Sequence, residues 1–154
     1  AAIVTPEHPP MRVASRPEFP TNDFTIEAFV VLRSVYDSGT VRVIASAWSG
    51  RETEPGWSFG VTGKGSRRKP QTLVMQLIGP TSDGKITHVP VFSDHTIQLN
   101  KPYYVAAAVR FARDGAPGVV DFYVKDLGND DEPLLHAAVE HALPVGIQSP
   151  FPLT

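Results

Sequence analysis

Residues 56–60 are the first segment whose residue types and spacing fit a catalytic motif. They read Gly-Trp-Ser-Phe-Gly and so match Gly-x-Ser-x-Gly, the nucleophile turn of serine hydrolases. That turn exposes its serine because a strand bends sharply into a helix. Here the segment has the pattern of a strand and runs into Gly63-Lys64-Gly65. We therefore interpret the match as coincidence, which an exposed Ser58 beside a histidine would overturn.

Metal-binding patterns are weak throughout the sequence. His136 and His141 are five residues apart, whereas a zinc-binding helix needs two histidines four apart. Acidic and amide side chains cluster in one loop, at Asp126, Asn129, Asp130, Asp131 and Glu132. Their oxygens are suited to calcium, but Asp and Asn also fill solvated turns, which is the stronger interpretation. The sequence therefore assigns no cofactor and no definite metal, and calcium at this loop stays an open alternative.

Two tryptophans flank the loop at residues 49–55, which also carries Arg51 and Glu52. Aromatic faces beside charged groups suit sugar stacking and protein contacts alike. We predict a ligand-binding site formed by Trp48, Arg51, Glu52 and Trp57. The alternative is that one or both tryptophans belong to the core.

The basic residues Lys64, Arg67, Arg68 and Lys69 form a second candidate site. An exposed loop with this charge can meet an acidic glycan or a phosphate. The alternative, which we favour, is a loop that only keeps the protein soluble.

Composition excludes several classes of partner. The 154 residues suit one domain, and 14 basic against 16 acidic residues give a net charge of −2. This balance gives no reason to expect nucleic acid, and no apolar run is long enough for a membrane span. The sequence contains no cysteine, so no disulfide supports the fold. The chain starts Ala1-Ala2-Ile3 without an initiator Met or a signal pattern, so we expect a processed chain or an excised domain.

Short β-rich runs separated by Pro and Gly predict an all-β sandwich or barrel. The longest run, Phe24–Arg33, has one apolar and one mixed face, and we expect its Glu27 to be a structural hydrogen-bonding residue. Thr72–Ile78 is apolar on both faces and therefore central, whereas Pro90 places its strand at an edge. The remaining expected strands are Met11–Ala14, Val41–Trp48, Trp57–Val61, Ile86–Phe92, Thr96–Leu99, Tyr103–Phe111 and Val119–Lys125.

Two segments need a closer look. In Val41–Trp48, strict alternation places Val41, Val43, Ala45 and Ala47 inward. Glu132–Leu143 fits both periods, and its local pattern slightly favours a helix that begins at Pro133.

Three segments resemble the laminin-G-like, concanavalin A-type jelly rolls. Residues 24–30 resemble the family's Phe-Thr-Ile-Glu-Ala-Trp-Val strand, with Phe29 in place of Trp. Residues 100–107 are similar to Asn-x-Trp-Tyr-His-Val-Ala, with Pro102 for Trp and Tyr104 for His. Residues 120–126 are similar to its hairpin strand x-Leu-Tyr-Val-Asn-Gly. The resemblance spans roughly residues 22–147.

The resemblance implies a fold: a two-sheet antiparallel jelly-roll sandwich over residues 21–154, preceded by a Pro-rich arm at residues 1–20. It also implies that residues 133–143 form a strand, against the local pattern. The family's closing strand, which lies beside the opening strand, has no counterpart here. We expect the arm, the C-terminal tail or a second copy to fill that edge, so a dimer through an open sheet edge is possible.

For function, the resemblance implies a non-catalytic carbohydrate-binding or adhesion module of a larger secreted or envelope protein. Its location would be extracellular, periplasmic or in the cell envelope, and its partner a carbohydrate or another protein domain. Glycosidases of this general fold carry Glu-x-Asp-x-x-Glu on one strand, and no such strand occurs here, so we expect no enzyme. The alternative is a protein-interaction or structural domain attached to a parent enzyme, without a glycan ligand.

Overall fold

The structure, a computed structural model, describes residues 11–14, 22–144 and 152–154. Most of the predicted arm, residues 1–10 and 15–20, therefore lies outside the described residues. The described part is all-β and contains eight strands. They are β1 (Phe24–Val31), β2 (Arg42–Ala47), β3 (Gly56–Val61), β4 (Thr72–Pro80), β5 (Ile86–Thr96), β6 (Pro102–Arg110), β7 (Gly118–Asp126) and β8 (Leu135–His141).

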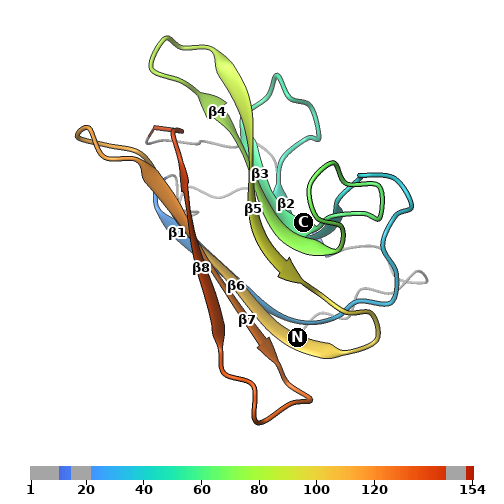
Figure 1. The fold of residues 1–154 in the computed structure, drawn as a ribbon. Coiled ribbons are helices and arrows are strands. Elements are labelled where there is room, and N and C mark those ends of the chain that lie inside the picture. The colour runs from blue at the N-terminus through green and yellow to red at the C-terminus, as the bar shows by residue number, and fades with distance from the viewer. Residues whose placement is uncertain (1–10, 15–21, 145–151) are drawn as a thin grey trace.

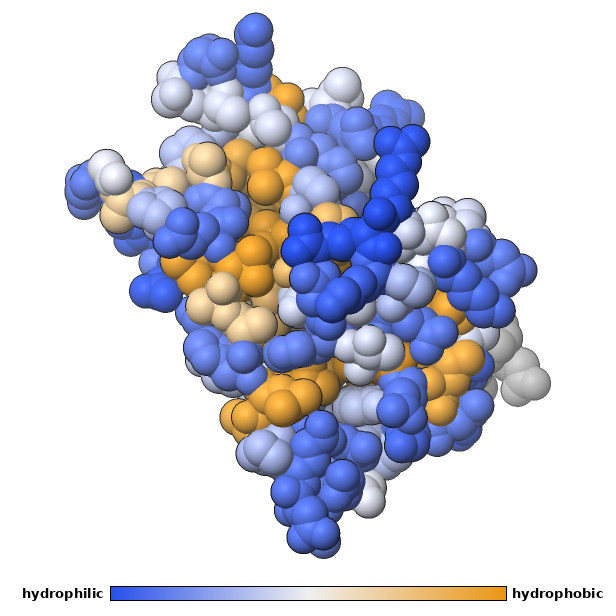
Figure 2. Space-filling view, viewed as in Figure 1, coloured by the Kyte–Doolittle hydropathy of each residue, from blue (hydrophilic) through white to orange (hydrophobic). Residues whose placement is uncertain are grey.

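The strands form two antiparallel four-stranded sheets, in the orders β1-β6-β7-β8 and β2-β3-β4-β5 (Figure 1). This arrangement confirms the predicted two-sheet sandwich. The core lies between the sheets and includes Phe59, Leu73, Val105 and Phe122. Polar side chains cover the loops at both ends of the side shown in Figure 2, and apolar ones appear between them.

Side-chain alternation explains most of the strand placements. On β1, residues from Phe24 to Val30 at every second position pack against the core, and the residues between them are exposed. β4 is buried on both faces and lies inside its sheet, as its continuous apolar sequence predicts. β5, which contains Pro90, is an edge strand, also as predicted. It continues to Thr96 across a register shift, beyond the expected end at Phe92. The separate strand expected at Thr96–Leu99 is wrong, because residues 97–99 lie outside the strands.

β8 settles the ambiguous segment as a strand. It pairs with β7 from Gly118↔His141 to Val124↔Leu135, and its residues alternate between part-buried and exposed. The helical pattern of residues 134–142 is therefore overridden by sheet pairing. Burial of one face against the core outweighs the local preference.

A β-bulge in β2 changes which side chains face the core. Register shifts between Val43 and Ala45, so Ile44 packs against the core, while Val43 points outward and is 48% exposed. The expectation that Val41 and Val43 face inward is wrong, because the extra residue reverses the alternation upstream of the bulge and both lie on the outer face of the sheet. Downstream of it, Ala47 is buried as predicted.

The described parts of the arm and tail pair with each other and with β2, not with the opening strand β1. Val13 and Leu153 exchange two backbone hydrogen bonds of 2.8 and 2.9 Å, and Thr154 exchanges two with Ser46, of 2.8 and 2.7 Å. The tail thus provides hydrogen-bond partners for the backbone N–H and C=O of Ser46 at the outer edge of β2. Within the described residues β1 pairs only with β6, so the arm and tail do not fill its edge there. The described residues contain no helix that is long and apolar enough to cross a membrane.

Candidate functional site

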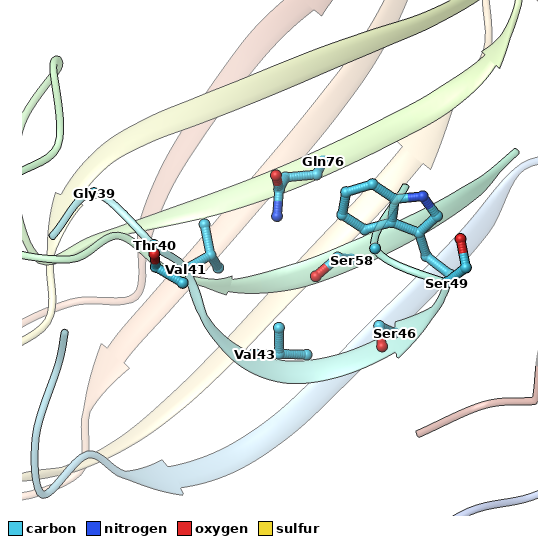
Figure 3. A pocket seen from close by; sticks show the side chains of 10 residues that line it. Gly39, Thr40, Val41, Val43, Ser46, Ser49, Ser58 and Gln76 are labelled. Carbon is cyan, nitrogen blue, oxygen red and sulfur yellow. The ribbon is translucent and has the colours of Figure 1, made fainter. Parts of the chain in front are cut away.

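A pocket of about 440 Å³ opens on the outer face of the β2-β3-β4-β5 sheet (Figure 3). It lies over β2, β3 and β4 and beneath the segment that leads into β2. The pocket is lined by Gly39, Thr40, Val41, Val43, Ser46, Trp48, Ser49, Gly50, Ser58 and Gln76.

Three polar side chains from adjacent strands lie in one row across this pocket. The register pairs Ser46 of β2 with Ser58 of β3, and Ser58 with Gln76 of β4. Ser58 is only 1% exposed, and within the described structure its hydroxyl has no hydrogen-bond partner. A buried hydroxyl without a partner costs free energy, so a ligand that supplies one gains from it.

Two glycines on β3 allow Trp48 and Val41 to approach the strand closely on either side of Ser58. A Cβ atom at Gly56 would lie 2.8 Å from Trp48 Cβ, and one at Gly60 would lie 2.6 Å from Val41 Cγ1. Both glycines are two residues from Ser58 and so share its face of β3. The Gly-x-Ser-x-Gly pattern therefore has a structural explanation: glycine makes room for the pocket walls on either side of the serine.

The walls are apolar and one of them is aromatic. The bulge in β2 turns Val43 toward the pocket, where it joins Val41. Trp48 also lines the pocket, and its indole Nε1–H donates to the carbonyl oxygen of Arg51 at 2.9 Å. This hydrogen bond fixes the ring while leaving its π faces for packing. A polar floor between apolar walls is typical of small-molecule sites.

A chain of hydrogen bonds connects the pocket to the surface. Gln76 Oε1 lies 3.0 Å from His88 Nε2, and His88 Nδ1 lies 3.1 Å from Glu52 Oε1. The His88 ring also lies beside Trp48, with ring centroids 5.8 Å apart. His88 therefore connects Glu52 with Gln76 on the pocket floor and with the Trp48 ring.

The structure divides the four residues of the predicted tryptophan site. Trp48 lines the pocket, and Glu52 reaches it through His88. Arg51 contributes its carbonyl oxygen to Trp48, but its side chain is exposed and lies 4.0 Å from Glu54. Trp57 points the other way, packs against the core and contacts the Phe24 ring. Ser58, Gln76 and His88 were not among the predicted site residues.

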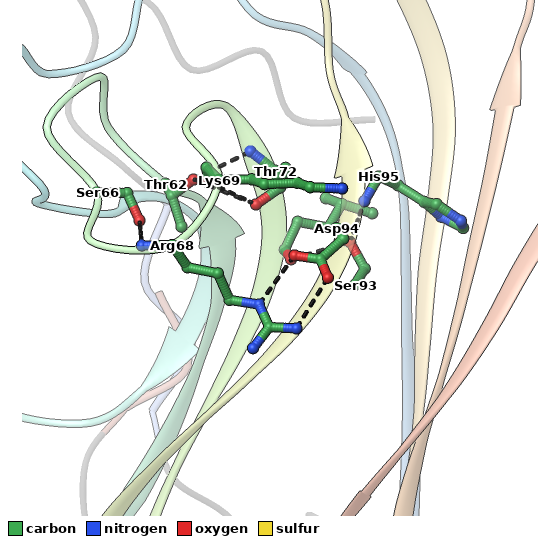
Figure 4. A network of polar contacts seen from close by, with 9 residues as sticks. Thr62, Ser66, Arg68, Lys69, Thr72, Ser93, Asp94 and His95 are labelled. Carbon is green, nitrogen blue, oxygen red and sulfur yellow. Dashed lines mark hydrogen bonds and ion pairs between the residues drawn. The ribbon is translucent and has the colours of Figure 1, made fainter.

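Half of the basic loop is engaged in ion pairs. Arg68 donates two hydrogen bonds to Asp94, of 2.9 and 2.8 Å (Figure 4), and these lower the pKa of that carboxyl. Lys64 lies 3.2 Å from Asp37. Among the described contacts, neither Arg67 nor Lys69 has an ion pair. The loop therefore presents less free positive charge than its sequence suggests.

Two further sequence patterns have local structural explanations. Ser58 lies within β3 rather than at a strand-to-helix turn, and its described hydrogen bonds include none to a histidine. In the acidic loop, Asp126 accepts from the amide of Gly128 at 2.9 Å, and the Asn129 side chain accepts from the amide of Asp131. No group of three His, Asp or Glu side chains suited to a metal occurs in the described part of the chain. These acceptors close turns.

Aromatic and charged side chains also line the outer face of the other sheet. The Phe29 side chain is 77% exposed and lies 5.6 Å from the Tyr104 ring, whose hydroxyl donates to Glu27 at 2.8 Å. Glu27 thus has the hydrogen-bonding role expected for it, and it raises the pKa of Tyr104. Across the sheet, Tyr123 and His136 stack at 4.8 Å.

Comparisons with protein-family models, with curated proteins and with solved structures found no match. The laminin-G-like resemblance therefore depends on the three sequence segments alone. Functional inference depends on the geometry of the site.

Proposed function

We propose that this chain is a non-catalytic carbohydrate-binding module whose site is the Trp48–Ser58 pocket. The observation that carries this proposal is the buried Ser58 hydroxyl, unpartnered in the described structure, on the floor of a pocket walled by Trp48. Sugars present both chemistries that such a site recognises: apolar C–H faces that pack on aromatic rings, and hydroxyl groups that donate and accept hydrogen bonds.

Size and lining fit a small polar ligand. A volume of about 440 Å³ lies toward the lower end of the range for small-molecule pockets, roughly 300–1,000 Å³. Ser46, Ser58 and Gln76 offer three hydrogen-bonding side chains in one row. A single sugar ring can contact this row with its hydroxyls while one face packs against Trp48.

The resemblance supports the same direction. A laminin-G-like, jelly-roll module would belong to a larger extracellular, periplasmic or envelope protein, with adhesion or lectin activity. The two observed sheets are compatible with that topology. In this proposal Trp57 is a core residue and not part of the site, since its ring packs against Phe24.

The test is titration of the protein with a glycan panel, followed by calorimetry on any glycan that binds. Trp48→Ala and Ser58→Ala should each weaken binding by about tenfold, through the lost stacking wall and the lost hydrogen-bonding group. Phe29→Ala removes an exposed aromatic ring from the opposite sheet and should leave affinity unchanged. No glycan bound, or equal affinity in all variants, would refute the proposal.

A second function, self-association through β1, is favoured by a separate observation. Within the described residues one edge of β1 is unpaired, and Phe29 and Val31 on this strand are exposed. A second copy can pair its β1 antiparallel about a two-fold axis and complete both edges. Sedimentation should then show a dimer that a Phe29→Lys, Val31→Lys variant loses. A monomer at all concentrations would rule this function out.

A further inference from the structure

Three side chains from separate elements link the pocket floor to solvent. Glu52 belongs to the loop between β2 and β3, His88 to β5 and Gln76 to β4. Both ring nitrogens of His88 are used: Nδ1 lies 3.1 Å from Glu52 Oε1, and Nε2 lies 3.0 Å from Gln76 Oε1. The amide nitrogen of Gln76 points toward Ser58 in the pocket (Figure 3).

The orientation of the Gln76 amide and the protonation of His88 are coupled, because the donor and acceptor roles of the ring nitrogens depend on the tautomer. A carboxylate oxygen and an amide oxygen both accept hydrogen bonds, so each ring nitrogen must donate. With Gln76 Oε1 toward the ring, this pattern of two donors corresponds to the imidazolium form. In this form the Gln76 amide oxygen is held by His88, and its NH₂ group is presented to the pocket as a donor.

When His88 loses one proton, the group that Gln76 presents to the pocket changes from a hydrogen-bond donor to an acceptor. The ionised Glu52 carboxylate can only accept, so Nδ1 keeps its proton and Nε2 becomes an acceptor. Gln76 Oε1 then faces a lone pair, which a rotation of the amide by about 180° relieves. After the rotation, the NH₂ group donates to Nε2 and the amide oxygen faces the pocket.

We propose that Glu52, His88 and Gln76 form a proton-controlled relay that switches the pocket from hydrogen-bond donor to hydrogen-bond acceptor as pH rises. The ligand half of this proposal rests on the proposed function. A sugar hydroxyl both donates and accepts and so binds either state, whereas a carboxylate only accepts. The relay therefore makes the pocket prefer a sugar that carries a carboxylate, a uronic acid, when His88 is protonated.

The surroundings of His88 are compatible with this switch. Histidine titrates in the mildly acidic to neutral range, where no other unperturbed side chain changes charge. Glu52 is the charged group that the described contacts place against the ring, and Trp48 packs beside it without charge. On the same loop, Arg51 is paired with Glu54. Ser58 can donate or accept, so it adapts to either orientation of Gln76.

The relay is tested without any ligand, by NMR titration between pH 4.5 and 8.5. The side-chain NH₂ resonances of Gln76 should shift with the same midpoint as the ring protons of His88. In His88→Gln they should no longer shift with pH. The matched control is His136→Gln, which removes another histidine–carboxylate pair, with Asp121 at 2.8 Å, from the opposite sheet. It should leave the Gln76 titration unchanged. Gln76 resonances that stay constant while His88 titrates would overturn the relay.

The ligand preference is tested with two probes of equal length, a glucuronate-containing oligosaccharide and a neutral glucose oligosaccharide. From pH 5 to pH 8, affinity for the acidic probe should fall about fivefold relative to the neutral one, the typical worth of one hydrogen bond. His88→Gln should abolish this change. A ratio independent of pH in the wild-type protein would overturn the preference. If neither probe nor any other glycan binds, the proposed function fails, while the NMR titration still decides the relay.

Discussion

The Trp57 ring lies against the Phe24 ring across the interior, with centroids 5.1 Å apart and planes at 37°. This contact joins β3 of one sheet to β1 of the other. Phe24 also contacts Phe111, with centroids 6.4 Å apart, so the three rings form an aromatic cluster at this end of the sandwich. It connects two sheets that share no backbone hydrogen-bonded strand pair.

Trp57→Ala should therefore destabilise the fold. A large aromatic replaced by Ala in a core typically costs 3–5 kcal/mol, and because Trp57 is only partly buried we expect about 3 kcal/mol. Urea unfolding, followed by the fluorescence of Trp48, measures this. Phe29→Ala removes an exposed ring and should cost under about 1 kcal/mol. Equal losses in the two variants would contradict the assignment of Trp57 to the core.

Gly60→Ala should lower stability by about 2–3 kcal/mol. The new Cβ would lie 2.4 Å from the carbonyl oxygen of Arg42, a backbone atom that moves only if β2 moves. The matched control is Gly128→Ala, whose nearest contact is 3.4 Å, and which should change stability by less than about 0.5 kcal/mol. Chemical denaturation compares the two. A neutral Gly60→Ala would mean that β2 does not approach β3 as closely as described.

Deletion of residues 152–154 should open the outer edge of β2. Four backbone hydrogen bonds would be lost, two to Val13 and two to Ser46. The expected loss of stability is about 1–3 kcal/mol. Hydrogen exchange should show faster exchange of the Ser46 amide, while the amide of Val74 in the central strand β4 changes less. Unchanged protection of Ser46 would show that the tail does not pair there in solution.

Stability should decrease as the solution becomes acidic, in part because of His141. Burial lowers the pKa of this group from its ordinary 6.5, only partly offset by the hydrogen bond to the Arg110 carbonyl. The neutral ring fits its site because Nε2–H donates to Arg110 and Nδ1 accepts from the Leu143 amide. Above pH 6.5 both folded and unfolded forms are neutral. As pH falls below it, the unfolded chain takes up the proton first, and stability is lost down to the folded pKa.

The measurement is urea unfolding between pH 7.5 and 5, together with NMR titration of the histidine ring protons. His141→Gln should reduce the pH slope of stability, whatever its effect at neutral pH. Burial also lowers the pKa of His95, so part of the slope should remain. A His141 ring that titrates at or above 6.5 would be inconsistent with the packing seen here.

Most strands could be predicted from sequence because, on a strand with one covered face, every second side chain is apolar and packs against the core. β1 shows this pattern most clearly, and β4, buried on both faces, shows the complementary one. For β8 the two periods competed, and local pattern alone favoured the wrong one. β8 is a strand because it pairs with β7, and the local periodicity of its sequence carries no information about that pairing.

The site was only partly predictable. Trp48 and Glu52 were found from their residue types, but Trp57 was grouped with them because it is near in sequence, although strand alternation turns it into the core. Ser58 and Gln76 meet only through the register of β3 and β4. The available signal was the pair of glycines two residues on either side of Ser58. On a strand, residues two positions apart lie on the same face, so two glycines at this spacing leave room on both sides of a single side chain.

Val43 and Ile44 are both apolar and lie on opposite faces of β2, and the bulge determines that Ile44 faces the core and Val43 the pocket. Ile44 contributes to the stability of the core, and Val43 contributes to the pocket wall. Substitutions at the two positions should therefore have separate consequences: at Ile44 they affect folding, and at Val43 they affect the wall of the proposed binding site. If the pocket binds the ligand proposed for it, Val43 can change its specificity without loss of the core, so this short segment of β2 is a place where the recognition of new ligands can evolve.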